Sequence, residues 1–424
     1  MRIVDFQVSA AERELRVIVK DALGVLLKQP LPEGVDPRAR IEAMVHEETT
    51  RFQERQVNRN QPLLPEPAAS EQWLLNEIFG LAMLEPLMAN PRITSIMVNS
   101  PTRIYVVVDG HTERAQGVWF DSDEQVREMV KRLAGAVGRR LDDASPRVDL
   151  TLPDGSRLHA LMPPITRQYT EVLIRKFTHR GLRLPALVAA GSFGPDLAQF
   201  LSAAVRAKVS LAVSGQTGAG KTTLLGGLVL EVDDPDERLI VLEETRELGV
   251  DVYTPNCLSW VARLPNADGV GAISIRSLLQ EDALRMEPSR IIVGEVRGPE
   301  SLDMLTAMNT GHQGSLSTIH ANSARDALYR LVVAAMQAPE RPSEEVLHRM
   351  IARCLQLVVQ MKRLRDGRRV VTEVFEITGL EGGELTGHQL WAWQDGRLAR
   401  TGLRPRCLEQ IAEAEIPYDW SDAA

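Results

Sequence analysis

The residues best suited to do chemistry stand together in the middle of the chain, at 215–222. There the sequence is GQTGAGKT, which matches the phosphate-binding pattern G-x-x-x-x-G-K-[ST]. Glycines let the backbone curl so that successive N–H groups point at phosphate oxygens, and the positive end of a following helix adds to that attraction. The pattern predicts a site for a nucleoside triphosphate made by Gly215, Gln216, Thr217, Gly218, Ala219, Gly220, Lys221, Thr222 and Thr223.

The elements that would position this loop are visible on both sides of it. Val209–Ser214 is a short apolar run typical of a buried strand, and Lys221–Val232 is typical of a helix that opens directly after the loop. We expect Lys221 to reach the terminal phosphates and Thr222 to complete the shell of a Mg²⁺ ion. A glycine-rich turn that binds nothing is the alternative, but it does not account for the order of strand, loop, lysine and helix.

Carboxylates follow two further apolar runs. Glu295 comes after the predicted strand 290–293, in a Walker B arrangement, where it can hold Mg²⁺ through water or orient the attacking water. Glu243 and Glu247 follow the predicted strand 238–242. They share a face only if that segment is helical, and a charged surface turn is the alternative.

Histidines and arginines supply the remaining candidates. His312 and His320 flank the predicted strand 315–319, where a satisfied core histidine is the usual alternative. Their spacing across a strand does not suit joint metal ligation. Upstream, Arg157 on a turn and Arg175 at the end of a strand could reach a phosphate bound by another domain. A solvated basic face that pairs with the acidic remainder of the chain is the alternative.

Taken in order, the chain predicts several parts. Residues 1–60 indicate two helices with polar joints, followed by a proline-rich linker. Residues 68–178 indicate a small α+β domain with a mostly antiparallel sheet, including a return strand near 115–120. A hinge is expected at 179–186. From 187 to 424 strands alternate with helices, which is typical of an α/β domain with a mostly parallel sheet and crossover helices, ending in an appended β element.

Composition limits the function further. The chain has 424 residues, 44% hydrophobic and 25% charged, which is ordinary for a soluble globular protein of two or three domains. Its net charge of −8 argues against a general nucleic-acid binder. Three widely spaced cysteines suit a reducing compartment and exclude a cysteine zinc site. No apolar run approaches the roughly 18–20 residues that span a bilayer, and the N-terminus does not resemble a signal peptide. A cytoplasmic protein is expected, with any membrane association made through a partner.

Several stretches together resemble a known family. GQTGAGKTT, LIVLEETREL, SRIIVGEVRG and MNTGHQGSLSTIHANSARDAL are similar to the Walker A, Asp box, Walker B and His box of the secretion-system ATPases of the type II/type IV superfamily. ITSIMVNSPTRIYV, GRRLDDASPRVDLTLPDGSRLHALMPP and LIRKF look like the N-terminal domain of its Tad/Flp-pilus branch. The likeness covers roughly residues 75–365. One departure is the acidic box, which has Glu243-Glu244 where that branch often has Glu-Asp.

The resemblance implies a RecA-like P-loop ATPase domain preceded by a small α+β domain and a helical N-terminal extension. It implies that Thr222 and Glu295 hold the Mg²⁺ of the nucleotide. The catalytic residues that it implies are Glu295, Glu243, Glu247 and Lys221.

The same resemblance implies roles in movement. His312 and His320 would sense the nucleotide or couple it to motion. Arg157 and Arg175 would contact phosphates when the N-terminal domain closes, on the same or on the neighbouring subunit.

The family's working form is a homohexamer at the cytoplasmic face of the inner membrane. Its domain motions would push on a polytopic platform protein to assemble a pilus or secrete protein. One alternative is a RecA-like nucleic-acid motor, which the 4% aromatic content and the negative charge disfavour. Another is a scaffold subunit that hydrolyses ATP poorly, against which the Walker B glutamate argues. Direct binding of nucleic acid is not expected.

Overall fold

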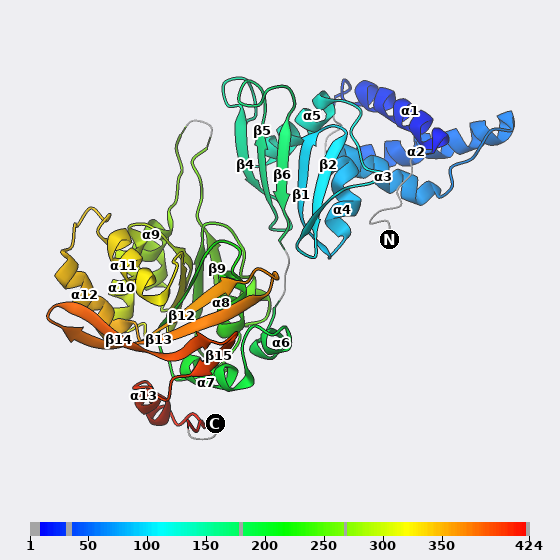
Figure 1. Cartoon of the computed structure of the whole chain (residues 1–424). Coiled ribbons are helices and arrows are strands. Elements are labelled where there is room, and N and C mark those ends of the chain that lie inside the picture. Colours follow the sequence, from blue (N-terminus) through cyan, green and yellow to red (C-terminus); the bar gives the residue numbers. More distant parts are fainter. Residues whose placement is uncertain (1–8, 31–35, 178–180, 267–268, 421–424) are drawn as a thin grey trace. The chain divides into compact units, whose positions relative to one another are not determined.

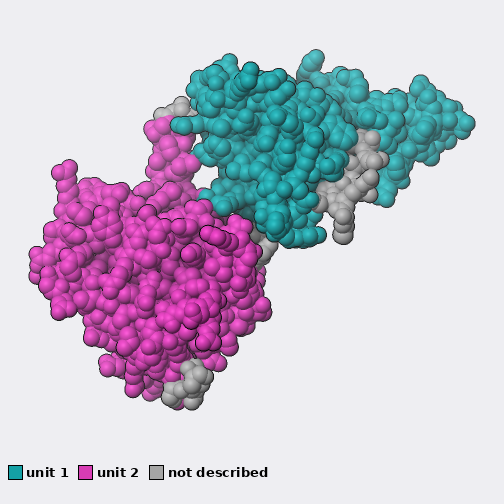
Figure 2. Space-filling model, viewed as in Figure 1, with its two compact units in different colours: residues 1–177 teal, residues 178–424 magenta. Residues whose placement is uncertain are grey.

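The structure is a computed structural model that describes residues 9–30, 36–177, 181–266 and 269–420 (Figure 1). It divides into two compact units, Met1–Phe177 and Thr178–Ala424, which are coloured separately in Figure 2. The first unit contains the elements from α1 to β6, and the second contains those from α6 to α13.

The first unit is built on a six-stranded sheet with the strand order β3-β2-β1-β6-β5-β4. All five neighbouring pairs are antiparallel, which agrees with the predicted sheet. The return strand is not at 115–120 as predicted. Asp109 and Gly110 have φ of 50° and 85°, so a tight turn sends the chain back at once. The strands are β1 (Ile93–Ser100), β2 (Arg103–Val108), β3 (His111–Arg114), β4 (Arg147–Thr151), β5 (Arg157–Leu161) and β6 (Glu171–Arg175).

Helices cover one face of this sheet. Ser9 caps α1 in a capping box with Glu12, which explains why that helix begins at Ala10. Leu15 and Phe52 from the first two helices are buried in the same core as Ile96 of β1, so these two helices fold together with the sheet. The helices are α1 (Ala10–Leu26), α2 (Pro37–Arg59), α3 (Pro67–Phe79), α4 (Glu85–Ala89) and α5 (Asp123–Ala136), with the 3₁₀ turn η1 (Ala82–Leu84).

The second unit is built on a nine-stranded sheet with the order β15-β14-β13-β12-β7-β11-β10-β8-β9. The five pairs from β12 to β9 are parallel, and the three from β12 to β15 are antiparallel. The C-terminal hairpins are therefore not an appended element, because β12 joins the parallel strands beside β7. The strands are β7 (Leu211–Gly215), β8 (Leu239–Glu243), β9 (Cys257–Val261), β10 (Arg290–Val296), β11 (Leu316–Ile319), β12 (Leu357–Arg363), β13 (Arg369–Glu381), β14 (Glu384–Gln394) and β15 (Arg397–Arg400).

Helices cover both faces of this sheet, which is the doubly wound α/β arrangement expected for residues 187–424. Val213 of β7 lies in one core and Ala212 in the other, because successive side chains point to opposite faces. From 275 to 285 the chain is continuously helical and passes from an α turn through a π turn to a 3₁₀ turn. The helical elements are α6 (Leu184–Ala189), α7 (Pro195–Arg206), α8 (Lys221–Val229), η2 (Val250–Val252), α9 (Ile275–Ser277), η3 (Leu278–Asp282), η4 (Ala283–Arg285), α10 (Glu300–Asn309), α11 (Ala324–Ala335), α12 (Glu344–Cys354) and α13 (Leu408–Glu413).

Three further features bear on the sequence predictions. The expected hinge at 179–186 lies partly outside the described residues, and Leu184 at the start of α6 is buried. The three cysteines are buried free thiols, and burial raises the pKa of Cys257 and Cys354 to about 12. Within the described parts of the chain, no helix has both the length and the apolar character needed to cross a membrane.

Candidate functional site

Four neighbouring strands of the second unit end at one edge of the sheet. The strands β7, β11, β10 and β8 are adjacent and parallel, so their carboxyl ends meet at the same side. Gly215 and Glu243 are the last residues of β7 and β8, Glu295 is next to last in β10, and His320 directly follows β11. This is the edge at which α/β sheets bind ligands.

The phosphate loop connects β7 to α8 at this edge. Gly218 and Gly220 have φ of 74° and 97°, in the left-handed region that side chains disfavour. Gly220 is the N-terminal cap of α8, so the free N–H groups of that helix begin at the loop. Residues 216–218 are exposed, whereas Ala219 is buried in the core. The strand, loop and helix predicted from the sequence are all present, and the tip of the loop is open to solvent.

Lys221, the first residue of α8, directs its ammonium back to the loop. Its Nζ lies 3.4 Å from the carbonyl oxygen of Gln216 and 3.4 Å from each ring nitrogen of His320. Burial lowers the pKa of Lys221, and the negative charges of Glu295 and Glu247 oppose that shift. A partly desolvated ammonium with such long contacts gains free energy when it meets phosphate oxygens.

His320 links the lysine to the Walker B carboxylate. Its Nε2 lies 2.7 Å from Oε1 of Glu295, and both side chains are partly exposed. Burial and the neighbouring charge of Lys221 lower the pKa of His320, against the opposing charge of Glu295, which favours a neutral ring at neutral pH. Three of the predicted site residues thus form one continuous chain of contacts.

The acidic segment after β8 reaches the same edge without being helical. Glu243 is buried, and its Oε1 accepts hydrogen bonds from the backbone N–H groups of Glu247 and Leu248, each at 3.0 Å. This folds the segment back on itself, so that Oε2 of Glu247 accepts a hydrogen bond of 3.2 Å from the Thr222 hydroxyl. Carboxylate and hydroxyl oxygens are ligands that Mg²⁺ prefers, so Thr222, Glu247 and Glu295 fit the magnesium ion of a nucleotide.

Within the second unit, one candidate is not brought to this cluster. His312 lies before the amino end of β11, where its Nδ1 is 2.9 Å from the carbonyl oxygen of Pro288, at the opposite edge from Lys221. Arg157 and Arg175 belong to the first unit, where they stand directly opposite each other on β5 and β6. Their contact with a bound nucleotide stays a prediction.

The structure also adds residues that sequence reasoning missed. Asn322 accepts a hydrogen bond of 3.0 Å from the Gln216 side chain, and Gln360 accepts one from the Ser214 hydroxyl. Arg369 on β13 donates from Nε to the carbonyl oxygen of Gly218 at 3.0 Å. Asn322 stands two residues after His320 in the HANS stretch, so its place in that motif could have identified it as a site residue. The other two come from C-terminal strands that carry no motif.

Comparison with known proteins adds an independent line of evidence. Residues 77–378 match the family model described as "Type II/IV secretion system protein". The chain is 38% identical over 324 residues to a putative conjugal transfer protein of Mycobacterium tuberculosis, covering 75% of this chain and 90% of that protein. It is 32% identical to the conjugal transfer protein TrbB of Rhizobium radiobacter, covering 72% and 91%. The solved structure of the ATPase DotB from Legionella pneumophila matches with a TM-score of 0.52 and 20% identity, covering 71% and 81%, which shows a shared fold.

Proposed function

Since this chain belongs to the family of type II/IV secretion system ATPases, we propose that it is a homohexameric motor that hydrolyses ATP to drive pilus assembly or secretion of protein. The observation that carries the proposal is the chain of contacts from Glu295 through His320 to Lys221 at an exposed phosphate loop. These groups can bind a triphosphate and deprotonate or orient water beside it.

Each residue of the cluster has a proposed task. Lys221 and the N–H groups of the loop bind the phosphates, while Glu295 orients the attacking water and His320 senses the terminal phosphate through Lys221. Glu243 holds the acidic segment so that Glu247 faces Thr222. A magnesium ion bound with the nucleotide would neutralise charge on the phosphates, held by Thr222, Glu247 and Glu295.

Arg157 and Arg175 are the proposed charges from the first unit that contact phosphate. Both are on the face of the antiparallel sheet away from its buried core, and they are cross-strand partners. Like charges directly opposite each other destabilise a sheet. The pair therefore concentrates positive charge at one place on the sheet, which suits binding of a polyanion.

The family branch, the location and the partner that we propose rest on the resemblance to the Tad/Flp-pilus ATPases. We place the protein in the Tad/Flp-pilus branch and expect it to work in the cytoplasm, at the inner face of the membrane, bound to a polytopic platform protein. Its domains would be 68–178 and 187–424, moving about the hinge at 179–186, with 1–60 as a helical extension. A role for His312 in coupling remains part of this proposal.

A nucleic-acid motor is the second candidate, because two relatives are named conjugal transfer proteins. Single-stranded DNA would then stimulate ATP turnover several-fold. Turnover that DNA leaves unchanged, together with co-purification of an integral-membrane protein, would favour the secretion motor.

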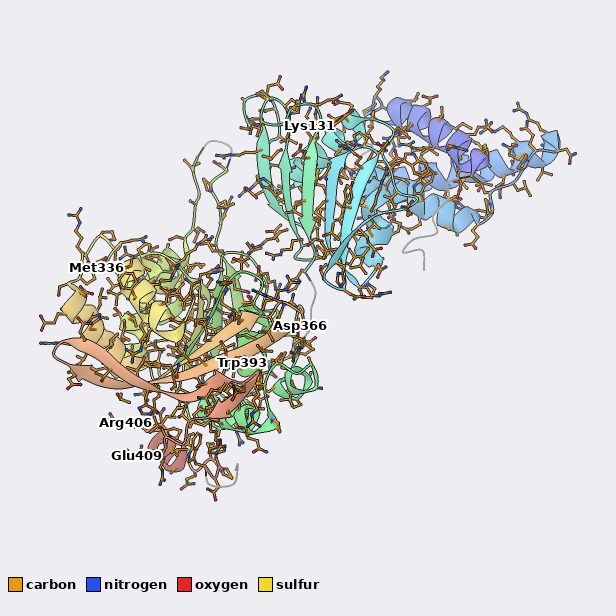
Figure 3. The ribbon with its side chains drawn as sticks, in the orientation of Figure 1. Lys131, Met336, Asp366, Trp393, Arg406 and Glu409 are labelled. Atoms are coloured by element: carbon orange, nitrogen blue, oxygen red, sulfur yellow. The ribbon has the colours of Figure 1, made fainter. Side chains whose placement is uncertain are left out.

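The test of the proposed site compares two lysine variants of the full chain. Lys221→Ala is expected to lower magnesium-dependent ATP turnover by at least about a hundredfold, because it removes the cation that meets the phosphates. Lys131→Ala, on the exposed side of α5 and labelled in Figure 3, is the matched control and should keep full turnover. Undiminished turnover in Lys221→Ala would refute the site, and an assembly that stays monomeric with ATP would refute the ring.

A further inference from the structure

The hairpin formed by β12 and β13 packs directly against the phosphate loop. Met361 of β12 is the register partner of Gly215. A Cβ atom at Gly215 would lie 2.5 Å from the Met361 carbonyl oxygen, and one at Gly220 would lie 3.1 Å from Cδ of Arg369. A side chain at Gly215 would therefore collide with the backbone of the hairpin, and one at Gly220 would crowd the Arg369 side chain.

Arg369, the first residue of β13, contacts the loop through its side chain. Its Nε donates a hydrogen bond of 3.0 Å to the carbonyl oxygen of Gly218. Gly218 is the middle glycine of the loop and has a φ of 74°. The guanidinium therefore holds the part of the loop that the core does not bury.

The hairpin carries other arginines near this contact. Arg369 is the register partner of Arg363 on β12. Asp366, at the turn of the hairpin (Figure 3), is paired with Arg368, whose Nε lies 2.8 Å from Asp366 Oδ2. Arg368 is thus a neighbouring arginine whose side chain contacts an aspartate of the turn, which makes it a suitable control for Arg369.

We propose that Arg369 is a positioning residue for ATP hydrolysis and that it fixes the phosphate loop in its binding conformation through the Gly218 carbonyl. The C-terminal hairpin is then a working part of the nucleotide site. This inference rests on the proposed binding of ATP at the loop. A loop that is already ordered loses less conformational freedom on binding, so the effect falls on nucleotide affinity and KM more than on kcat.

The experiment uses the full chain with Arg369→Ala, Arg369→Lys, Arg368→Ala and Lys221→Ala. Affinity for Mg–ADP is measured by titration calorimetry, with KM and kcat for ATP and the melting temperature of the ligand-free protein. Arg369→Ala is expected to weaken affinity and raise KM by about fivefold, which corresponds to about 1 kcal/mol. Arg369→Lys should recover most of that loss, because lysine restores a charged donor. Arg368→Ala is the matched control, with affinity within about twofold of the original.

Two results would overturn the inference. One is affinity for Mg–ADP within about twofold of the original in Arg369→Ala, whatever its melting temperature. The other is an equal loss in Arg368→Ala, which would indicate a general effect of positive charge. If Arg369→Ala does not fold, Arg369→Met decides, because it keeps the aliphatic stem and removes the donor: unchanged KM and affinity in that variant would overturn the inference. Undiminished binding by Lys221→Ala would instead refute the proposed function itself.

Discussion

Both edges of the parallel sheet in the second unit carry charged residues. Those at the amino edge are buried and paired with each other, whereas those at the carboxyl edge have long contacts or are partly exposed. At the amino edge, Arg290 is 1% exposed and forms a bidentate ion pair with Glu237, with N–O distances of 2.5 and 2.7 Å. At the carboxyl edge, Lys221 has contacts of 3.4 Å, and Glu295 and His320 are partly exposed. The residues at the amino edge therefore make their hydrogen bonds within the fold, whereas those at the carboxyl edge can still form strong hydrogen bonds with a ligand.

This difference shows that residue type alone does not identify a site. A buried ion pair has already lost its water and found its partner, so it has little to gain from a phosphate. A lysine with only long contacts, beside a partly exposed carboxylate and a neutral imidazole, can still exchange these contacts for stronger ones. The predictions below test the two edges against each other.

The largest effect is expected for the amino edge, on stability. Glu237→Gln leaves the buried guanidinium of Arg290 without its counter-charge, and we expect it to lower the free energy of unfolding by about 3–5 kcal/mol. Urea unfolding measures this loss. The double variant Glu237→Leu with Arg290→Met should recover most of it, and the folded fraction should bind Mg–ADP normally. A single variant as stable as the original would show that the pair adds nothing.

At the carboxyl edge the effect is expected on turnover instead. Glu295→Gln removes the carboxylate that orients water, and we expect kcat to fall by at least about a hundredfold with binding of Mg–ADP retained. Glu384→Gln, exposed at the start of β14, is the control and should have unchanged kcat. Turnover by Glu295→Gln close to that of the control would assign the water-orienting role to another residue.

Local pattern predicts the loop because its parts are contiguous. Strand, turn and helix from Leu211 to Val229 follow one another along the chain. The apolar periodicity and the glycines of this one stretch are therefore enough to predict their order. Strand direction could also have separated the two histidines. In a parallel strand His320 must lie at the carboxyl edge and His312 at the other, so the two histidines cannot both contact the same nucleotide edge.

Contacts between distant segments could not be predicted in the same way. Ser214 and Gln360 are 146 residues apart, and Gly218 and Arg369 are 151 apart. They meet because β12 pairs with β7, and the order of strands in a sheet depends on packing of the whole domain. Periodicity of a single strand holds no information on its neighbour, which is why the sequence predicts an appended element where the C-terminal hairpins in fact extend the main sheet.

The two histidines test the difference between the edges with the same residue type, because His320 lies at the carboxyl edge and His312 at the amino edge. His320→Ala removes the ring between Lys221 and Glu295, and we expect turnover to fall by about tenfold. His312→Ala removes one hydrogen bond to the Pro288 carbonyl, which should cost about 1 kcal/mol of stability with turnover within about twofold of the original. Steady-state kinetics measure the turnover of both variants, and urea unfolding measures their stability. Equal losses of turnover would show that the amino edge takes part in the ATP cycle.

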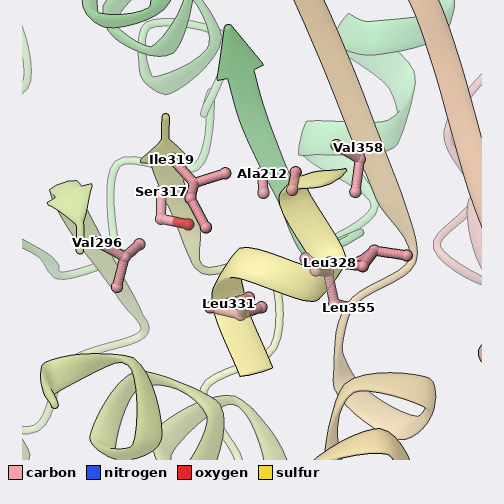
Figure 4. A pocket seen from close by; sticks show the side chains of 9 residues that line it. Ala212, Val296, Ser317, Ile319, Leu328, Leu331, Leu355 and Val358 are labelled. Carbon is pink, nitrogen blue, oxygen red and sulfur yellow. The ribbon is translucent and has the colours of Figure 1, made fainter. Parts of the chain in front are cut away.

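The smallest effect on stability is expected for Ser317, which lies inside β11 between the two edges of the sheet. The hydroxyl of Ser317 is buried in a small pocket lined by apolar side chains such as Ala212, Leu328 and Val358 (Figure 4), and it has no hydrogen-bond partner among the described residues. A buried polar group without a partner is unfavourable, so Ser317→Ala should raise the free energy of unfolding by about 1 kcal/mol and leave turnover unchanged. Ser315 is the matched control, since its hydroxyl accepts from Ile291 N–H and donates to the His312 carbonyl oxygen. Ser315→Ala should therefore destabilise, and a loss of stability in Ser317→Ala as well would mean that a bound water satisfies its hydroxyl.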